Sequence, residues 1–190
     1  MSSRESNLKE KFRIALTSTA KVISDNFDLI KKDFEKNNSK DINSLEIGNI
    51  NSPRDFVKLR AETDSSALKK KFSNDTIYKK NLPGNNSSRS LYNIAEKIRY
   101  EALGGQMLKG IEKNFHENYS QIISQKRRDQ LKTKDDVAVT EAFELYMLKN
   151  FHKVKLNPLT SKMLNFWEKD FESSIEKHKE FLLNNLEDQD

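Results

Sequence analysis

Residues 97–115 read KIRYEALGGQMLKGIEKNF, a stretch that combines a helical pattern with an unusual number of glycines. Gly104 and Gly105 are adjacent, Gly110 follows closely, and the whole chain has only five glycines. A glycine in a helix interior costs roughly 1 kcal/mol relative to alanine. Three glycines in one helical stretch therefore call for a structural or functional explanation.

The buried side of this stretch is expected to change at the glycine pair. On a helical wheel that advances about 100° per residue, one apolar stripe lies within about 60° of Leu91. It consists of Leu91, Ile94, Ala95, Ile98 and Ala102. The next apolar residues fall between about 120° and 260° on the same wheel. They are Leu103, Met107, Leu108, Ile111 and Phe115. Either a kink at the glycines or a neighbouring segment packed on their bare backbone explains the exchange. Packing within the chain is favoured, and contact with a partner chain is the alternative.

The remaining pattern predicts a mainly α-helical fold. Apolar residues recur at three- and four-residue spacing over residues 6–24. Ser52-Pro53 and Asn157-Pro158 each place a capping residue before a proline, which is typical of a helix start. These starts predict one helix over residues 53–80 and a last helix that begins at Pro158.

One small β-hairpin is expected in residues 27–50, because SLEIGNI at residues 44–50 alternates polar and apolar side chains. The length fits one domain with its own core. We therefore predict a single helical domain over residues 1–186. The acidic residues 187–190 are interpreted as the start of a linker or a free end.

The composition of the chain argues against several classes of protein. Against 34 Lys and Arg stand 29 Asp and Glu, for a net charge of +5, and there is no cysteine. The sequence therefore offers no disulfide and no thiol nucleophile. The mean hydropathy is −0.85, no apolar run approaches the roughly 20 residues of a membrane span, and the N-terminal stretch lacks a secretory pattern. A cytoplasmic location is expected.

Two basic clusters, Lys69–Lys71 and Lys126–Arg128, raise the possibility of nucleic-acid binding. Aromatic residues that would stack on bases are not interleaved with the second cluster. Mixed charge at this density is more typical of a solvated helix face. A basic helical module that binds nucleic acid or oligomerises as a scaffold stays the alternative function.

Motifs of catalysis or metal binding are weak in this chain. Gly105 and Gly110 have the glycine spacing of a phosphate-binding loop, but Ile111 and Glu112 replace its Lys and Ser/Thr. Glu112 and His116 share a helix face, although an exposed ion pair explains them more simply than a metal site. We assign no catalytic, cofactor-binding or metal-binding residue.

Residues 99–115, RYEALGGQMLKGIEKNF, resemble the R-x-E-A-L-G-x-x-x-M-x-G-x-x-x-N-L signature in the N-terminal region of the cobaltochelatase CobT subunit family. Residues 12–23 are similar to the opening helix of that family, and residues 60–68 match its R-G-x-A-D-x-x-A-L segment imperfectly. Asn74 and Tyr78 stand where the family has histidines.

This resemblance implies a role in aerobic cobalamin synthesis. The chelatase is a ligase that forms nitrogen–metal bonds, inserting Co²⁺ into hydrogenobyrinic acid a,c-diamide at the expense of ATP. The implied partners are an AAA+ ATPase subunit (CobS-like) and the large subunit that holds the tetrapyrrole (CobN-like). The complex implies ATP, Mg²⁺ and Co²⁺, while this chain is expected to bind no cofactor and not to be catalytic by itself.

The family's metal-binding von Willebrand A domain follows an acidic linker, so the chain resembles the N-terminal domain alone. We expect it to act as a docking platform for the ATPase. The residues expected to shape this platform or to contact the partner lie on the signature: Arg99, Glu101, Gly104, Gly105 and Met107.

Overall fold

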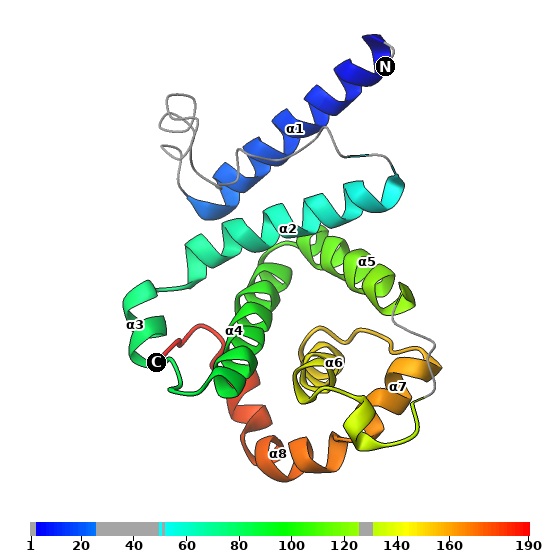
Figure 1. The fold of residues 1–190 in the computed structure, drawn as a ribbon. Coiled ribbons are helices and arrows are strands. Elements are labelled where there is room, and N and C mark those ends of the chain that lie inside the picture. The colour runs from blue at the N-terminus through cyan, green and yellow to red at the C-terminus, as the bar shows by residue number, and fades with distance from the viewer. Residues whose placement is uncertain (1–2, 26–49, 51, 126–130) are drawn as a thin grey trace. The chain divides into compact units, whose positions relative to one another are not determined.

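The computed structural model describes residues 3–25, 50, 52–125 and 131–190. These residues form eight α-helices and one short 3-10 helix, and they contain no strand (Figure 1). The predicted mainly helical class is thus confirmed. The predicted hairpin at residues 27–50 lies outside the described residues, Ile50 apart. None of the described helices has the length and hydrophobicity needed to cross a membrane.

The chain divides into two compact units, Met1–Phe72 and Ser73–Asp190. Here they are called unit 1 and unit 2, and each is described by itself. The prediction of one domain over residues 1–186 stays a prediction.

The described part of unit 1 consists mainly of two helices, α1 (Ser3–Ser24) and α2 (Pro53–Phe72), which pack against each other. The rings of Phe12 and Phe56 meet edge to face with their centroids 4.8 Å apart. Such aromatic pairs contribute stability beyond the area they bury. The periodicity of residues 6–24 therefore correctly predicted a packed helix.

The two predicted proline starts are present, each with a hydrogen-bonded cap. The Ser52 backbone N–H donates to the Asp55 carboxylate at 2.8 Å, at the beginning of α2. The Asn157 side-chain oxygen accepts from the Thr160 backbone N–H at 2.9 Å. Both contacts satisfy groups that the first turn of a helix leaves without an intrahelical partner.

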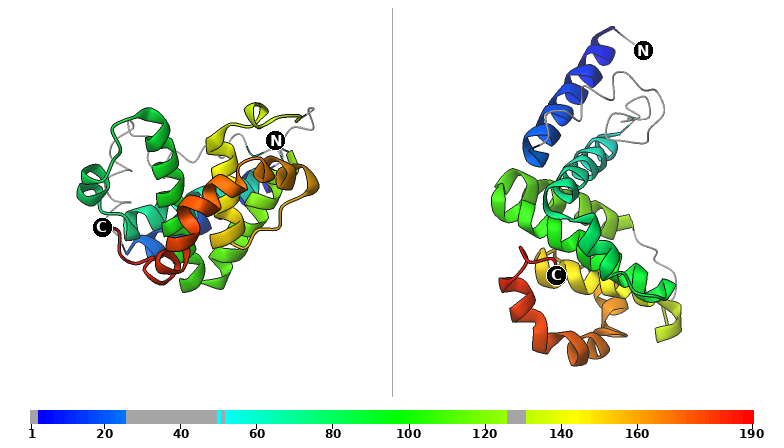
Figure 2. Two further views of the ribbon diagram at one scale, coloured as in Figure 1. Left: turned by 90° about the horizontal axis from the view of Figure 1, so that it is seen from below. Right: turned by 90° about the vertical axis from the view of Figure 1, so that its left-hand side faces the viewer.

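Unit 2 contains the other described elements. They are α3 (Asp75–Lys80), α4 (Asn86–Met107), α5 (Lys109–Gln125), η4 (Lys134–Asp136), α6 (Val139–Phe151), α7 (Pro158–Asn165) and α8 (Glu168–Asn184). Helix α6 packs against α4, α7 and α8 (Figure 2). It carries buried residues on most of its circumference, which is typical of a central helix.

Two predicted helices are each divided in the structure. The helix expected over residues 53–80 ends at Phe72, and Asn74 caps the new helix α3 by accepting from the Thr76 and Ile77 backbone N–H groups. The helix expected from Pro158 onward is α7 followed by α8, because Trp167 stands between them and donates its indole N–H to the Val137 carbonyl at 3.1 Å.

The glycine-rich stretch is also two helices. Helix α4 ends at Met107, Leu108 takes an extended conformation (φ −141°, ψ 113°), and α5 begins at Lys109. Figure 1 shows α5 turned away from the axis of α4. The buried side changes because the chain starts a new helix just after Leu108, so of the two explanations the kink at the glycines themselves is wrong.

Candidate functional site

The α4–α5 junction brings Gly105 close to the first turn of the next helix. A Cβ atom added to Gly105 would lie 3.4 Å from the Glu112 Cβ. Gly104 is buried, whereas a Cβ on Gly110 would meet nothing within 4 Å. The close neighbour of Gly105 is therefore α5. Met107 is 41% exposed, so the expectation that it lies in the core is wrong.

Arg99 joins α4 to the segment that follows α8. Its Nε donates to Glu96 Oε2 at 2.7 Å, and one terminal nitrogen donates to the Leu186 carbonyl at 2.7 Å. Gln189 Nε2 also donates to Glu96, at 2.9 Å. Because Glu96 is 7% exposed, Arg99 neutralises a carboxylate that burial would otherwise destabilise, and Gln189 supplies a further hydrogen bond to it.

Unlike Arg99, the Glu101 side chain lies in the core of unit 2. Tyr119 donates its hydroxyl proton to Glu101 Oε2 at 2.5 Å. His152 Nε2 lies 3.8 Å from the same oxygen and has no hydrogen-bond partner among the described residues. All three side chains are buried. The Lys97 ammonium lies 4.0 Å from the other Glu101 oxygen.

Burial shifts the pKa values of Tyr119 and His152 in this cluster. It raises the pKa of Tyr119 well above its ordinary value, and the Glu101 carboxylate adds to the rise. Burial also lowers the pKa of His152 to about 4, with smaller contributions from the positive charges of His116 and Lys97. His152 is consequently neutral at physiological pH.

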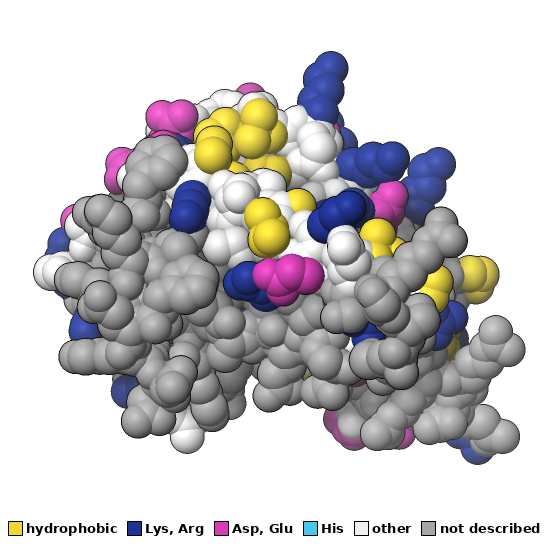
Figure 3. Space-filling view, turned by 90° about the horizontal axis from the view of Figure 1, so that it is seen from above, with side chains coloured by type: hydrophobic (Ala, Val, Ile, Leu, Met, Phe, Trp, Pro, Cys, Tyr) yellow, Lys and Arg dark blue, Asp and Glu magenta, His cyan; other side chains and the backbone are white. Residues whose placement is uncertain are grey.

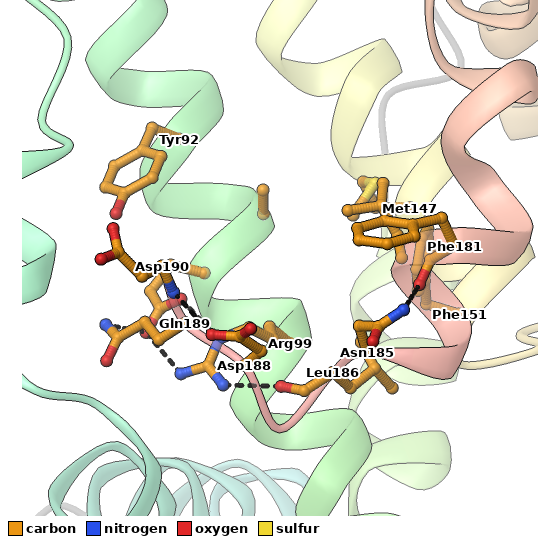
Figure 4. Close-up of a pocket in the computed structure, with 13 residues that line it drawn as sticks. Tyr92, Arg99, Met147, Phe151, Phe181, Asn185, Leu186, Asp188, Gln189 and Asp190 are labelled. Atoms are coloured by element: carbon orange, nitrogen blue, oxygen red, sulfur yellow. Dashed lines mark hydrogen bonds and ion pairs between the residues drawn. The ribbon is translucent and has the colours of Figure 1, made fainter.

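Unit 2 contains a largely apolar pocket of about 300 Å³, called the α8 groove below. It is formed by α4, α6, the end of α8 and the residues after it. Its lining comprises Tyr92, Ala95, Glu96, Arg99, Met147, Phe151, Phe181, Leu182, Asn185, Leu186, Asp188, Gln189 and Asp190. Figure 4 shows Met147, Phe151 and Phe181 gathered on one side, and Arg99, Asp188 and Gln189 on the other. The groove thus has an apolar wall and a polar wall.

A second pocket, of about 500 Å³, lies beside the α4–α5 junction. Gly105, Glu112 and His152 are among its lining residues, and Phe151 lines both pockets. Two of the expected shaping residues therefore line hollows of unit 2, Arg99 the α8 groove and Gly105 the second pocket, while Glu101 lies in the core.

The surface outside these pockets mixes charge and apolar side chains. On the face shown in Figure 3, basic, acidic and hydrophobic side chains are interspersed. Lys69–Lys71 occupy the last turn of α2, where positive charge is stabilised by the helix dipole, and Lys71 also pairs with Asp25. Lys126–Arg128 lie outside the described residues. Nucleic-acid binding and a scaffold role stay predictions.

Other candidate positions have structural partners. Asn74 caps α3, and Tyr78 donates its hydroxyl proton to the Asn93 side chain. Among the described residues, no three His, Cys, Asp or Glu side chains come together as a metal site would require.

Sequence reasoning missed two features of unit 2. His152 gave no local signal, because its neighbours Glu101 and Tyr119 come from α4 and α5 and only the fold brings them together. The α8 groove did have a signal: Phe181, Leu182 and Leu183 are three consecutive apolar residues in a charged helix, more than a single buried stripe requires.

Comparison with known proteins places the chain in a family. The chain matches no curated protein and no solved structure. A family model does match residues 6–190, and it is described as cobalamin biosynthesis protein CobT. The match includes the signature at residues 99–115, all of unit 2 and unit 1 from residue 6 onward. The chain therefore belongs to the CobT family of cobalamin biosynthesis proteins.

Proposed function

We propose that this chain is an assembly domain of the ATP-dependent cobalt chelatase, docking on the AAA+ ATPase subunit. The observation that carries the proposal is the family match over residues 6–190. The ATPase would hydrolyse ATP with Mg²⁺, and the large subunit would hold hydrogenobyrinic acid a,c-diamide, into which Co²⁺ is inserted as a substrate. This chain would transmit movement between them and would form no bond itself.

Apolar surface that the described fold leaves exposed supports a docking role. Unit 2 exposes large apolar side chains at the α4–α5 junction and at the end of α8. They include Met107, Leu108, Phe181, Leu182 and Leu183, each at least 37% exposed. Phe181, Leu182 and Leu183 also line pockets, and exposed apolar side chains beside a hollow are typical of surfaces that bind other proteins.

The experiment is co-purification of the full chain with a tagged ATPase subunit, with and without ATP and Mg²⁺. We expect a stable complex that elutes together in gel filtration. If the two proteins migrate separately under both conditions, the docking role is wrong. The large subunit, tested in the same way, shows whether the chain bridges both partners.

A further inference from the structure

The end of α8 carries more apolar surface than unit 2 covers. Successive residues of a helix are about 100° apart, so Phe181, Leu182 and Leu183 together span roughly 200° of its circumference. A core-facing stripe needs a width of about 100°. Accordingly, Phe181 is 65% exposed and Leu182 is 41% exposed.

These side chains line two pockets of unit 2. Phe181 and Leu182 line the α8 groove, while Leu183 lines the second pocket. Because Phe151 lines both pockets, the apolar strip continues from one to the other. A strip that extends over two pockets is longer than a small molecule in one of them would cover. It suits an elongated occupant such as a helix.

The polar wall of the α8 groove carries one carboxylate, Asp188, that forms no ion pair among the described residues, whereas the other two are paired. Glu96, Asp188 and Asp190 line it, against the single cation Arg99. Arg99 pairs with Glu96 and Lys80 pairs with Asp190, so these four charges are compensated within the chain. Asp188 is exposed and forms no ion pair with any described residue. Asp188 is therefore available to pair with a cationic side chain of a partner, and it disfavours a phosphate at the same place.

We infer that the α8 groove binds a basic amphipathic helix of a partner protein. The apolar face of that helix packs on Phe151, Phe181 and Leu182, and a Lys or Arg beside this face pairs with Asp188. The inference rests on the proposed function for the identity of the partner, which would be the ATPase subunit. The binding chemistry of the groove is independent of that identity.

The first test measures binding of labelled helical peptides to the full chain by fluorescence anisotropy. One peptide is made of Leu and Lys, and a matched peptide carries Glu in place of Lys. We expect binding of the Leu/Lys peptide and at least about tenfold weaker binding of the Leu/Glu peptide, a difference of about 1.4 kcal/mol. The net charge of the chain is +5, so nonspecific attraction would favour the opposite order.

Variants locate the binding surface. Leu182→Asp should weaken binding of the Leu/Lys peptide at least about tenfold, and Asp188→Lys should weaken it several-fold, since each removes one component of the groove. The matched control is Ile122→Asp on α5. Ile122 is 41% exposed, as Leu182 is, but lines neither pocket. It should leave the affinity within about twofold of the unchanged chain. Circular dichroism verifies that all variants fold.

Two results would overturn the inference: equal affinity for the two peptides, or equal effects of Leu182→Asp and Ile122→Asp. Self-association that Leu182→Asp abolishes would also overturn it, because the occupant would then be a second copy. Failure of the proposed function is recognised separately. In that case the Leu/Lys peptide binds the groove as expected, yet the ATPase subunit does not co-purify with the chain.

Discussion

Gly105 and Gly110 stand on opposite sides of the α4–α5 junction and have different surroundings. A leucine at position 105 would crowd α5, since an added Cβ already lies 3.4 Å from the Glu112 Cβ and 3.7 Å from the Glu112 Cα. We expect Gly105→Leu to lower the free energy of unfolding by about 1–3 kcal/mol. Gly110→Ala adds a methyl group in open space and should raise it by up to about 1 kcal/mol. Urea denaturation of both variants measures this. If both substitutions changed the free energy of unfolding equally, the α4–α5 junction would not constrain the side chain at position 105.

His152 makes the stability of the chain depend on pH. Its pKa is about 4 in the folded chain and near 6.5 when unfolded, so below pH 6.5 the unfolded state binds the proton more readily. The free energy of unfolding should therefore fall as the pH drops from 6.5 to 4. His152 contributes about 3 kcal/mol to this loss. Thermal unfolding at a series of pH values measures the slope.

The groups around the His152 imidazole decide whether acidification lowers or raises the stability of the chain. Glu101 and Lys97 face it from α4, and Tyr119 and His116 belong to α5. His152→Leu should flatten the pH profile between 4 and 6.5. The control His178→Gln changes an exposed side chain and should leave the profile unchanged. A gain of stability on acidification would mean that Glu101 pairs with a protonated His152.

At the scale of elements, Glu96 connects α4 to the residues just before α3 and to the segment that follows α8. It accepts hydrogen bonds from Ser73, Arg99 and Gln189. Glu96→Ala would leave the Arg99 guanidinium, 12% exposed, without its carboxylate. We expect a loss of about 3 kcal/mol in the free energy of unfolding.

An exposed ion pair provides the comparison for Glu96. Lys80 and Asp190 pair at 2.8 Å, but their side chains are 64% and 52% exposed. Lys80→Ala should therefore cost less than about 1 kcal/mol. If chemical denaturation gave the same loss for Lys80→Ala as for Glu96→Ala, Glu96 would not be the principal link between α4 and its neighbours.

Local signals in the sequence correctly predicted helix starts, because a cap depends on residues three positions apart. Ser52 with Asp55 and Asn157 with Thr160 are such pairs. The breaks at residue 74 and residue 167 were missed, although Asn74 is a common capping residue. Trp167 ends a helix because its indole reaches Val137, a contact that only the tertiary fold creates.

The candidate site was predicted less completely than the fold. The signature led to Arg99 and Glu101, which the structure places in different environments, one beside the α8 groove and one in the core. A helical wheel assumes that one helix continues. It therefore assigned Met107 to a buried face, whereas the chain starts a new helix just after that residue. The groove itself needs α4, α6 and α8 together, and no single window of sequence contains them.

At the scale of the whole molecule, unit 2 has the features of an independently folding domain. Its size lies within the range of common domains. Its core contains an aromatic cluster in which Phe143, Tyr146 and Trp167 surround Phe171, with ring centroids 5.4–6.3 Å apart. Every residue that lines the α8 groove also belongs to unit 2. Folding and binding by this unit should therefore not require unit 1.

We accordingly expect a fragment of residues 73–190 to fold by itself. It should give a helical circular dichroism spectrum, unfold in one cooperative transition, and bind the Leu/Lys peptide with the affinity of the full chain, because the core and groove are retained. The Leu182→Asp version of the fragment should fold equally well and lose the peptide. If the fragment has no cooperative transition while the full chain unfolds in a single step, the two compact units depend on each other for stability. Residues 1–186 would then be one domain, as the sequence alone predicts.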